Sequence, residues 1–190
     1  MSRVSKAQAE ANRASVVTAA SQLFRQRGIQ GVSVADLMKA VGLTHGGFYK
    51  QFESKDSLVT EATAQAFVDR GVYLAGLEEN SSTRAQARRD LVEEYLSPEH
   101  RDDPGTGCPS AGFASDLAHA ALEGNTMPQK PYADGVRAFA DWMSDEEGDE
   151  GLVATCTMVG AILLARATSS TDLSEEILDA ARKAVGSSLA

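Results

Sequence analysis

The chain has 190 residues, of which 43 % are hydrophobic and 24 % charged, with a formal net charge of −9. This balance is typical of a globular protein and excludes a disordered chain, and the length suffices for one large domain or two small ones. Two cysteines are too few for a disulfide framework, no secretory signal is recognisable, and the most apolar run, residues 152–167, is too short to span a bilayer. We therefore expect a cytoplasmic protein with reduced thiols.

The charge is unevenly distributed along the chain. Residues 1–57 carry eight basic and four acidic side chains, a net charge of +4. The remaining residues carry ten basic and 23 acidic side chains, a net charge of −13. Because phosphate binding depends on the local field, a basic head on an acidic molecule is compatible with nucleic-acid binding. We expect only that end of the molecule to approach DNA.

The hydrophobic periodicity is helical throughout, so we predict an all-α protein. Residues 1–6 are expected to form a loose basic arm. Cap and turn residues divide the next fifty positions, namely Gly28, Ser33, Gly42, Thr44 and Ser54. They predict helices over residues 8–27, 33–40 and 45–50, and a long helix from residue 55 to about 77.

The second half of the chain shows the same periodicity, interrupted by polar segments. It predicts helices over residues 83–96, 108–122, 130–143, 152–167 and 172–186. Residues 99–107 and 144–151 are expected to be charged loops, with His100 in the first. We expect Tyr73 on the buried side of the long helix, and Leu173, Ile177, Ala181 and Ala184 on the apolar stripe of the last one.

Residues 33–58 combine what a helix–turn–helix needs. The first short helix offers apolar packing residues, Gly42 tolerates a positive φ, and Leu43 closes the small core. The segment resembles the TetR family of transcriptional regulators over about residues 9–60. The resemblance rests on a phrase with fixed spacing, present here as Gly42, Gly47, Phe48, Tyr49, Phe52, Lys55 and Leu58.

The resemblance implies a DNA-binding domain at residues 1–57 and an effector-binding and dimerisation domain at residues 58–190. The residues implied to face DNA are Ser33, Thr44, His45, Gly46, Gly47, Tyr49, Lys50 and Lys55. Lys55 would grip a phosphate from the start of the long helix. Phe48 and Phe52 are expected in the core, and Lys39 is expected to be a solvated surface charge. The alternative for the whole segment is a helical hairpin without a nucleic-acid role.

Family members are homodimers, and the resemblance implies a self-interface formed by residues 152–167 and 172–186. The first of these helices is apolar nearly all round, which indicates burial on several sides. Its small residues Gly160, Ala161 and Ala165 would let a partner helix approach closely. The alternative is a central core helix of a monomer. Cys156 is expected to be inert packing inside this helix.

The C-terminal domain of the family usually encloses a small-molecule pocket. Candidate lining residues are Tyr73, Tyr95, Cys108, Phe113, Leu117, Trp142 and Met158, although each is equally suited to the core. The acidic surround favours a cationic or neutral effector. Cys108 resembles a cysteine at the same junction in a subgroup of the family, some members of which sense electrophiles through it. A helix N-terminus stabilises a thiolate, so Cys108 is either a sensor or a small buried cap residue.

The sequence argues against an enzyme, a cofactor or a metal site. His119 lies eleven residues after Cys108, too far along one helix for a hydrogen bond, and Asp116 with His119 supplies too few metal ligands. The remaining alternative is an accessory or scaffold protein of the same fold that does not bind DNA. For a DNA-binding protein, repression is favoured over activation because no separate activating segment is visible.

Overall fold

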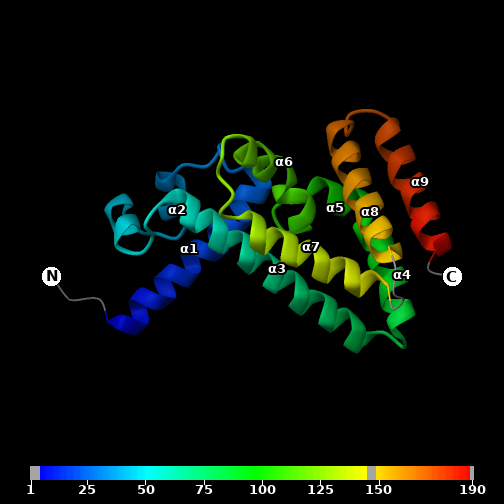
Figure 1. Ribbon diagram of the computed structural model, residues 1–190, viewed down its shortest axis with the longest axis horizontal. Helices are drawn as coiled ribbons and strands as arrows, with labels where there is room; N and C mark the ends of the chain where they lie inside the picture. The colour runs from blue at the N-terminus through cyan, green and yellow to red at the C-terminus, as the bar shows by residue number, and fades with distance from the viewer. Residues whose placement is uncertain (1–4, 145–148, 189–190) are drawn as a thin grey trace.

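The computed structural model describes residues 5–144 and 149–188, and every element within these ranges is a helix, as predicted (Figure 1). Residues 1–4 of the expected arm and residues 145–148 of the expected acidic loop lie outside the described residues. The elements in chain order are α1 Lys6–Arg27, α2 Val34–Ala40, the 3₁₀ helix η1 His45–Lys50, α3 Lys55–Asn80, α4 Arg84–Tyr95, α5 Pro98–Asp102, α6 Pro109–Leu122, α7 Gln129–Met143, α8 Glu150–Ala167 and α9 Leu173–Ser188.

Local capping chemistry explains most helix boundaries. Ser33 and Asp36 form a reciprocal capping box at the start of α2, and Ser54 forms another with Ser57 at the start of α3. Gly28 and Gly42 adopt φ values of 74° and 70°, which confirms both predicted turns.

Two other predicted features of the helices were wrong. Residues 98–102 form the short helix α5 instead of a loop, because the Ser97 hydroxyl accepts a hydrogen bond from the His100 nitrogen at 3.2 Å and Pro98 suits a first turn. Thr44 precedes η1 but makes no side-chain capping hydrogen bond, and η1 is a 3₁₀ helix instead of an α-helix.

Two hydrophobic cores lie along the molecule, and α3 contributes to both. The N-terminal core contains Leu58 and Ala66 of α3 together with Phe113 and Leu117 of α6, whereas Leu74 of α3 belongs to the C-terminal core. The predicted domain boundary at residues 57 and 58 therefore falls within the first turn of a continuous helix. Since α6 also enters the N-terminal core, the two halves share a packed surface.

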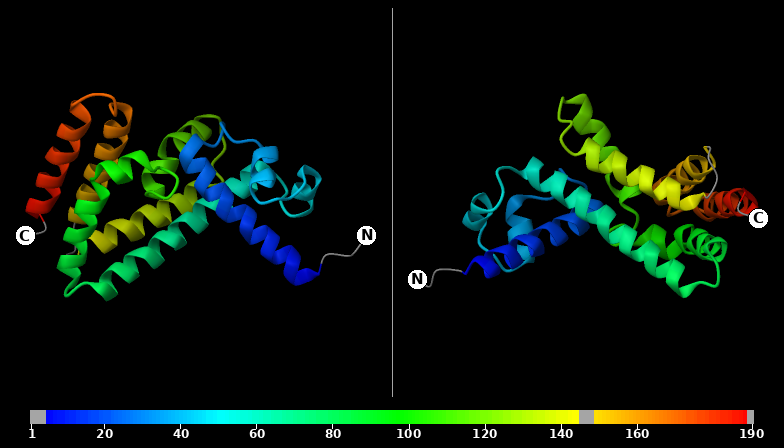
Figure 2. Two further views of the ribbon diagram at one scale, coloured as in Figure 1. Left: turned by 180° about the vertical axis from the view of Figure 1, so that it is seen from behind. Right: turned by 60° about the horizontal axis from the view of Figure 1, so that its bottom comes forward.

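The long helix α3 runs beside α7, and α8 and α9 pair at the end of the molecule far from α2 (Figures 1 and 2). Gly135 of α7 permits the close approach, because a Cβ there would lie 2.1 Å from the Phe67 ring of α3. By length and composition alone α8 could cross a membrane, yet it packs between α7 and α9.

The expected burial of Tyr73 was wrong, since this side chain is 37 % exposed. On the predicted apolar stripe of α9, Leu173 is 49 % exposed and Ala184 is also exposed, so the core of the single chain does not cover them. The α9 residues that face the core are Ser174, Leu178, Ala181 and Val185. Only Ala181 belongs to the predicted stripe, and each of the other three lies one position after a predicted residue. Ile177 of the predicted stripe is partly buried against the C-terminal core, whereas Leu173 and Ala184 lie on the outer side of α9.

Candidate DNA-binding surface and effector cavity

The helix–turn–helix is built on the N-terminal core. The Leu43 nitrogen donates to the Met38 carbonyl at 2.8 Å, which closes the turn after Gly42. Phe48 is fully buried and stacks on Phe52 with 5.3 Å between ring centroids, so both aromatic rings are core residues, as expected. These inward anchors fix η1 on the head and leave its other residues at the surface.

The exposed residues of η1 and its flank include most of the predicted DNA contacts. Thr44, His45, Gly46, Tyr49 and Lys50 are exposed, and Tyr49 retains 65 % of its accessible surface. Folding leaves this large aromatic ring mostly in water, and the ring forms T-shaped pairs with the rings of His45 and Phe48. The structure thus brings these five predicted residues together on one short segment.

Glycine at position 46 has no packing explanation within the chain. A Cβ there would meet nothing within 4 Å, whereas a Cβ at Gly47 would lie 3.4 Å from the Met38 methyl group. The open space at Gly46 leaves its backbone accessible from outside. The structure accordingly places a bare stretch of backbone between His45 and Tyr49.

Ser33 and Lys55 use their polar groups within the chain. The Ser33 hydroxyl accepts from the Asp36 nitrogen at 3.1 Å. The same hydroxyl and the Ser33 nitrogen donate to the Asp36 carboxylate at 2.5 and 3.0 Å, and these two hydrogen bonds lower the pKa of Asp36. The Lys55 ammonium donates to the Ile29 carbonyl at 2.6 Å, and burial lowers its pKa. A phosphate contact by Lys55 stays a prediction. For such a contact, the ammonium would have to bind the phosphate in addition to the Ile29 carbonyl or in place of it.

A cavity of about 530 Å³ lies behind the head, where α1, α3, α4 and the segment before α6 meet. Of the seven predicted lining residues, Tyr73 and Tyr95 line it, and Cys108 lies between the lining residues Gly107 and Pro109. The other four lie elsewhere: Phe113 and Leu117 are in the N-terminal core, and Trp142 and Met158 in the C-terminal core.

Sequence reasoning missed the two cations of the cavity wall, Arg25 and Arg70. Arg70 lies four residues after the buried Ala66 and four before the buried Leu74. Because residues four apart lie on the same face of a helix, the sequence could have placed Arg70 on the inner face of α3. Arg25 holds the cavity rim, because its Nη1 donates to the Gly107 carbonyl and its Nε to the Ser21 carbonyl.

His100 is fixed as a neutral imidazole beside Cys108, and its prediction as a loop residue was wrong. Its Nδ1 donates to the Tyr95 carbonyl at 2.7 Å, and its Nε2 accepts from the Cys108 backbone nitrogen at 3.0 Å. Burial lowers the His100 pKa to about 4, helped by Arg166 and Arg70. With both ring nitrogens in use, His100 offers the Cys108 thiol no free base.

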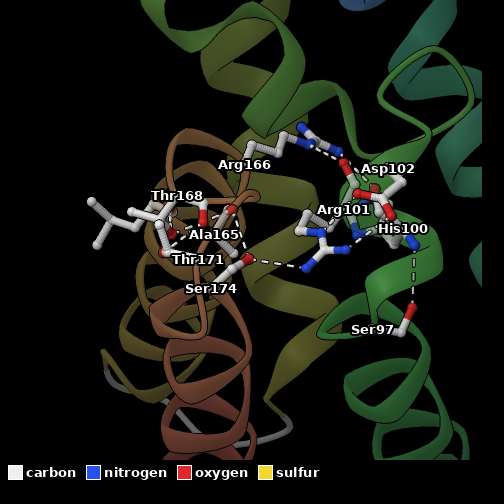
Figure 3. A network of polar contacts seen from close by, with 10 residues as sticks. Ser97, His100, Arg101, Asp102, Ala165, Arg166, Thr168, Thr171 and Ser174 are labelled. Carbon is white, nitrogen blue, oxygen red and sulfur yellow. Dashed lines mark hydrogen bonds and ion pairs between the residues drawn. The ribbon is translucent and has the colours of Figure 1, made fainter.

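The last turn of α8 holds α5, and hence His100, in place (Figure 3). Arg166 donates from Nη2 to the His100 carbonyl at 2.9 Å and from Nε to the Arg101 carbonyl at 3.0 Å. Arg101 in turn donates to the Ser174 hydroxyl at 3.0 Å. The cavity wall is therefore tied to the helix pair α8 and α9.

The two cysteines differ in exposure. Cys108 is 1 % exposed at the start of α6, whereas Cys156 is exposed on α8, contrary to its expected burial. Among residues 5–144 and 149–188, no cluster of three or more possible metal ligands occurs. Asp116 and His119 have other partners, since Asp116 accepts from the Ile29 nitrogen at 3.0 Å and the His119 ring bonds the Ser115 carbonyl.

The outer side of α8 is apolar and uncovered in the single chain. Val153 is 62 % and Leu164 58 % exposed, and a Cβ on Gly160 would meet nothing within 4 Å. Ala161 and Ala165, expected to face a partner helix, are buried in the chain's own C-terminal core. Gly160 is thus the small residue that the fold leaves facing outward.

Comparison with known proteins agrees with this architecture. The model of bacterial regulatory proteins of the tetR family matches residues 16–62. The regulator AcrR of Shigella flexneri is 34 % identical over 61 residues, which cover 32 % of this chain and 28 % of that protein. An uncharacterised HTH-type transcriptional regulator of Mycobacterium tuberculosis is 25 % identical over 163 residues, covering 80 % of this chain and 82 % of that protein.

Solved structures share the fold over nearly the whole chain. A TetR-family regulator from Agrobacterium tumefaciens superposes with a TM-score of 0.76 at 19 % identity, covering 95 % of this chain and 98 % of that one. The reduced form of E. coli NemR gives 0.75 at 18 % identity, covering 92 % and 95 %. The family match over residues 16–62 identifies the head as a helix–turn–helix domain of the TetR family, and the regulator relatives together with the shared fold support a transcriptional regulator of that family.

Proposed function

We propose that the protein is a homodimeric cytoplasmic repressor, released from its operator by a small molecule in the cavity or by modification of Cys108. The observation that carries the DNA-binding part is the exposed set Thr44, His45, Tyr49 and Lys50 at the tip of a basic head. Tyr49 and Thr44 would contact phosphates, and His45 and Lys50 would face base edges or adjoining backbone. The bare backbone at Gly46 would allow close approach to the duplex.

The outer side of α8 and α9 supports the homodimer. One such head offers little surface for tight specific binding, and two heads related by a twofold axis would reach adjacent major grooves. The exposed apolar side chains on these helices are the surface that a second copy would cover, namely Val153, Leu163, Leu164 and Leu173. Covering them would remove an apolar patch from water.

Operator binding is tested by selecting bound fragments from the source genome and measuring affinity for the selected duplex by fluorescence anisotropy. Affinity should fall steeply as salt rises, because binding releases counterions. Tyr49→Ala should weaken binding more than Tyr49→Phe, which keeps the ring and removes only the hydroxyl. Negligible binding that does not vary with salt would favour the accessory or scaffold alternative.

The thiol part is tested with two matched variants. Cys108→Ser removes the buried thiol beside the cavity, and Cys156→Ser removes the exposed one. Both should bind operator, and a small oxidant or electrophile should release Cys156→Ser but not Cys108→Ser. Unchanged release of Cys108→Ser would leave Cys108 as a structural residue at the start of α6.

A further inference from the structure

The cavity wall contains donors that folding leaves without acceptors. The Nε and Nη2 atoms of Arg70 are shielded from water and make no hydrogen bond to any residue that the structure describes. The hydroxyl of Tyr95, a residue only 2 % exposed, is likewise without a hydrogen bond of ordinary geometry in the described chain. Both side chains line the same cavity. Buried donors without acceptors cost free energy, so a ligand that supplies a hydrogen-bond acceptor would be favoured at this site.

Ring faces, and not hydrogen bonds, hold the Arg70 guanidinium. Its central carbon lies 5.0 Å from the Tyr73 ring centroid, 5.2 Å from that of Phe139 and 5.8 Å from that of Tyr95. Such contacts favour the positive charge but leave the in-plane N–H groups unsatisfied. Nε and Nη2 form one edge of the guanidinium, and that edge matches the two oxygens of a carboxylate.

The carboxylates of the protein do not fill this role. The four acidic side chains that line the cavity are exposed, and three of them accept hydrogen bonds from within the chain. Gln65 donates to Asp69 at 2.8 Å, Tyr73 donates to Glu94, and the Thr106 hydroxyl donates to Asp103 at 2.6 Å. The second cation, Arg25, is occupied by the Gly107 and Ser21 carbonyls. The acidic side chains that favoured a cationic or neutral effector are therefore the exposed ones, whereas the buried edge of the Arg70 guanidinium has no acidic partner.

We propose that the effector carries a carboxylate, which accepts hydrogen bonds from Arg70 and Tyr95, on an apolar or aromatic body that packs in the rest of the cavity. This inference rests on the proposed effector function and adds the chemical class of the ligand. Because no hydrogen bond fixes the guanidinium, it can turn its Nε and Nη2 edge toward the ligand. A volume of about 530 Å³ accommodates a small organic acid.

The protonation state of Tyr95 agrees with a donor role. Burial, and then the neighbouring Cys108 thiol, raise the pKa of Tyr95 well above its ordinary value. The phenol therefore keeps its proton at neutral pH. A thiol is a weak acceptor, so a carboxylate would be a better partner for this hydroxyl.

The test uses a panel of monocarboxylates, including benzoate, cinnamate and octanoate, each paired with its primary amide. Titration calorimetry is run on the full chain, on Arg70→Met, on the shape-preserving Tyr95→Phe, and on Arg89→Met, which removes an exposed α4 cation outside the cavity. We expect an acid to bind at least about tenfold more tightly than its amide, a loss of about tenfold or more in Arg70→Met, a smaller loss in Tyr95→Phe, and no change in Arg89→Met.

The inference is overturned if no acid in the panel binds, if amides bind as well as acids, or if Arg70→Met binds acids like the wild type. Should Arg70→Met fail to fold, an unchanged acid affinity in Tyr95→Phe decides against the proposal. Operator binding of the same preparations is scored separately. Release by neutral or cationic probes alone would leave the repressor function standing and remove the carboxylate, whereas acid-selective binding without operator binding would do the reverse.

Discussion

Asp116 of α6 accepts a hydrogen bond from the Ile29 backbone nitrogen at 3.0 Å, while Lys55 of α3 donates to the carbonyl of the same residue at 2.6 Å. Ile29 lies in the turn between α1 and α2 and is therefore held from two sides. The Lys55 hydrogen bond comes from within the head, and the Asp116 hydrogen bond comes from α6, the helix that follows Cys108. The position of the helix–turn–helix thus depends on where α6 lies.

Removing the α6 hold should destabilise the protein. Asp116→Ala leaves the Ile29 nitrogen without its charged acceptor, and we expect the free energy of unfolding to fall by about 1.5 to 3 kcal/mol. Asp116→Asn keeps a carbonyl acceptor and should lose less. Urea denaturation measures both, with Asp134→Ala as a control, since its exposed pair with Lys130 is worth less than about 1 kcal/mol. Equal stabilities of Asp116→Ala and the control would contradict this role.

Two glycines of α8 should respond oppositely to alanine. A Cβ at Gly151 would lie 2.1 Å from the Ala140 carbonyl oxygen, so Gly151→Ala should destabilise the fold by about 1 to 3 kcal/mol. Gly160→Ala meets open space in the single chain, and the better helix propensity should leave the protomer as stable or up to about 1 kcal/mol more stable.

At a homodimer interface, however, the added methyl of Gly160→Ala would hinder the partner helix. Sedimentation velocity should therefore show a weaker dimer for Gly160→Ala at unchanged protomer stability. A dimer as tight as the wild type would move the interface away from this position.

His100 should make stability depend on pH below neutrality. Its pKa is about 4 in the folded chain against an ordinary 6.5, so the unfolded chain binds more protons between these values. The free energy of unfolding should therefore rise as pH increases from about 4 to 6.5, by up to about 3 kcal/mol from this group. His100→Gln should flatten that part of the curve, whereas the exposed His119→Gln should not. The same slope in both variants would assign it to other groups.

Two exposed lysines of the head separate specific contact from general charge. Lys50 lies on η1 beside Tyr49, and Lys39 lies in the last turn of α2. Lys50→Ala should weaken operator binding and reduce the slope of log affinity against log salt by about one, if Lys50 meets a phosphate. Lys39→Ala should change both less. Equal effects would indicate a diffuse field without a defined contact at Lys50.

The features that sequence predicted well depend on neighbours in the chain. Ser33 with Asp36, and the glycines at 28 and 42, act within a few residues, so their caps and turns follow from local rules. The family phrase then placed Phe48 and Phe52 in the core and left Tyr49 outside, as the structure has them.

The features that sequence missed depend on distant partners. Lys55 is hydrogen-bonded to Ile29, His100 to Cys108, and the His100 carbonyl accepts a hydrogen bond from Arg166 of α8. The spacing of residues in the sequence could not reveal these contacts. Cys156 lies on a helix that is apolar all round, and its sequence alone could not tell the inner face from the outer one. Arg70 was readable in principle, since it continues the buried period of α3.

Gln22 and Arg25 belong to α1, the first helix of the DNA-binding head, yet both also line the cavity. A ligand that fills the cavity would touch the head directly, without an intervening relay. Binding of ligand and of operator are then linked through one helix, and thermodynamic linkage is reciprocal. If the bound effector lowers the affinity for operator DNA by some factor, bound operator DNA must lower the affinity for the effector by the same factor.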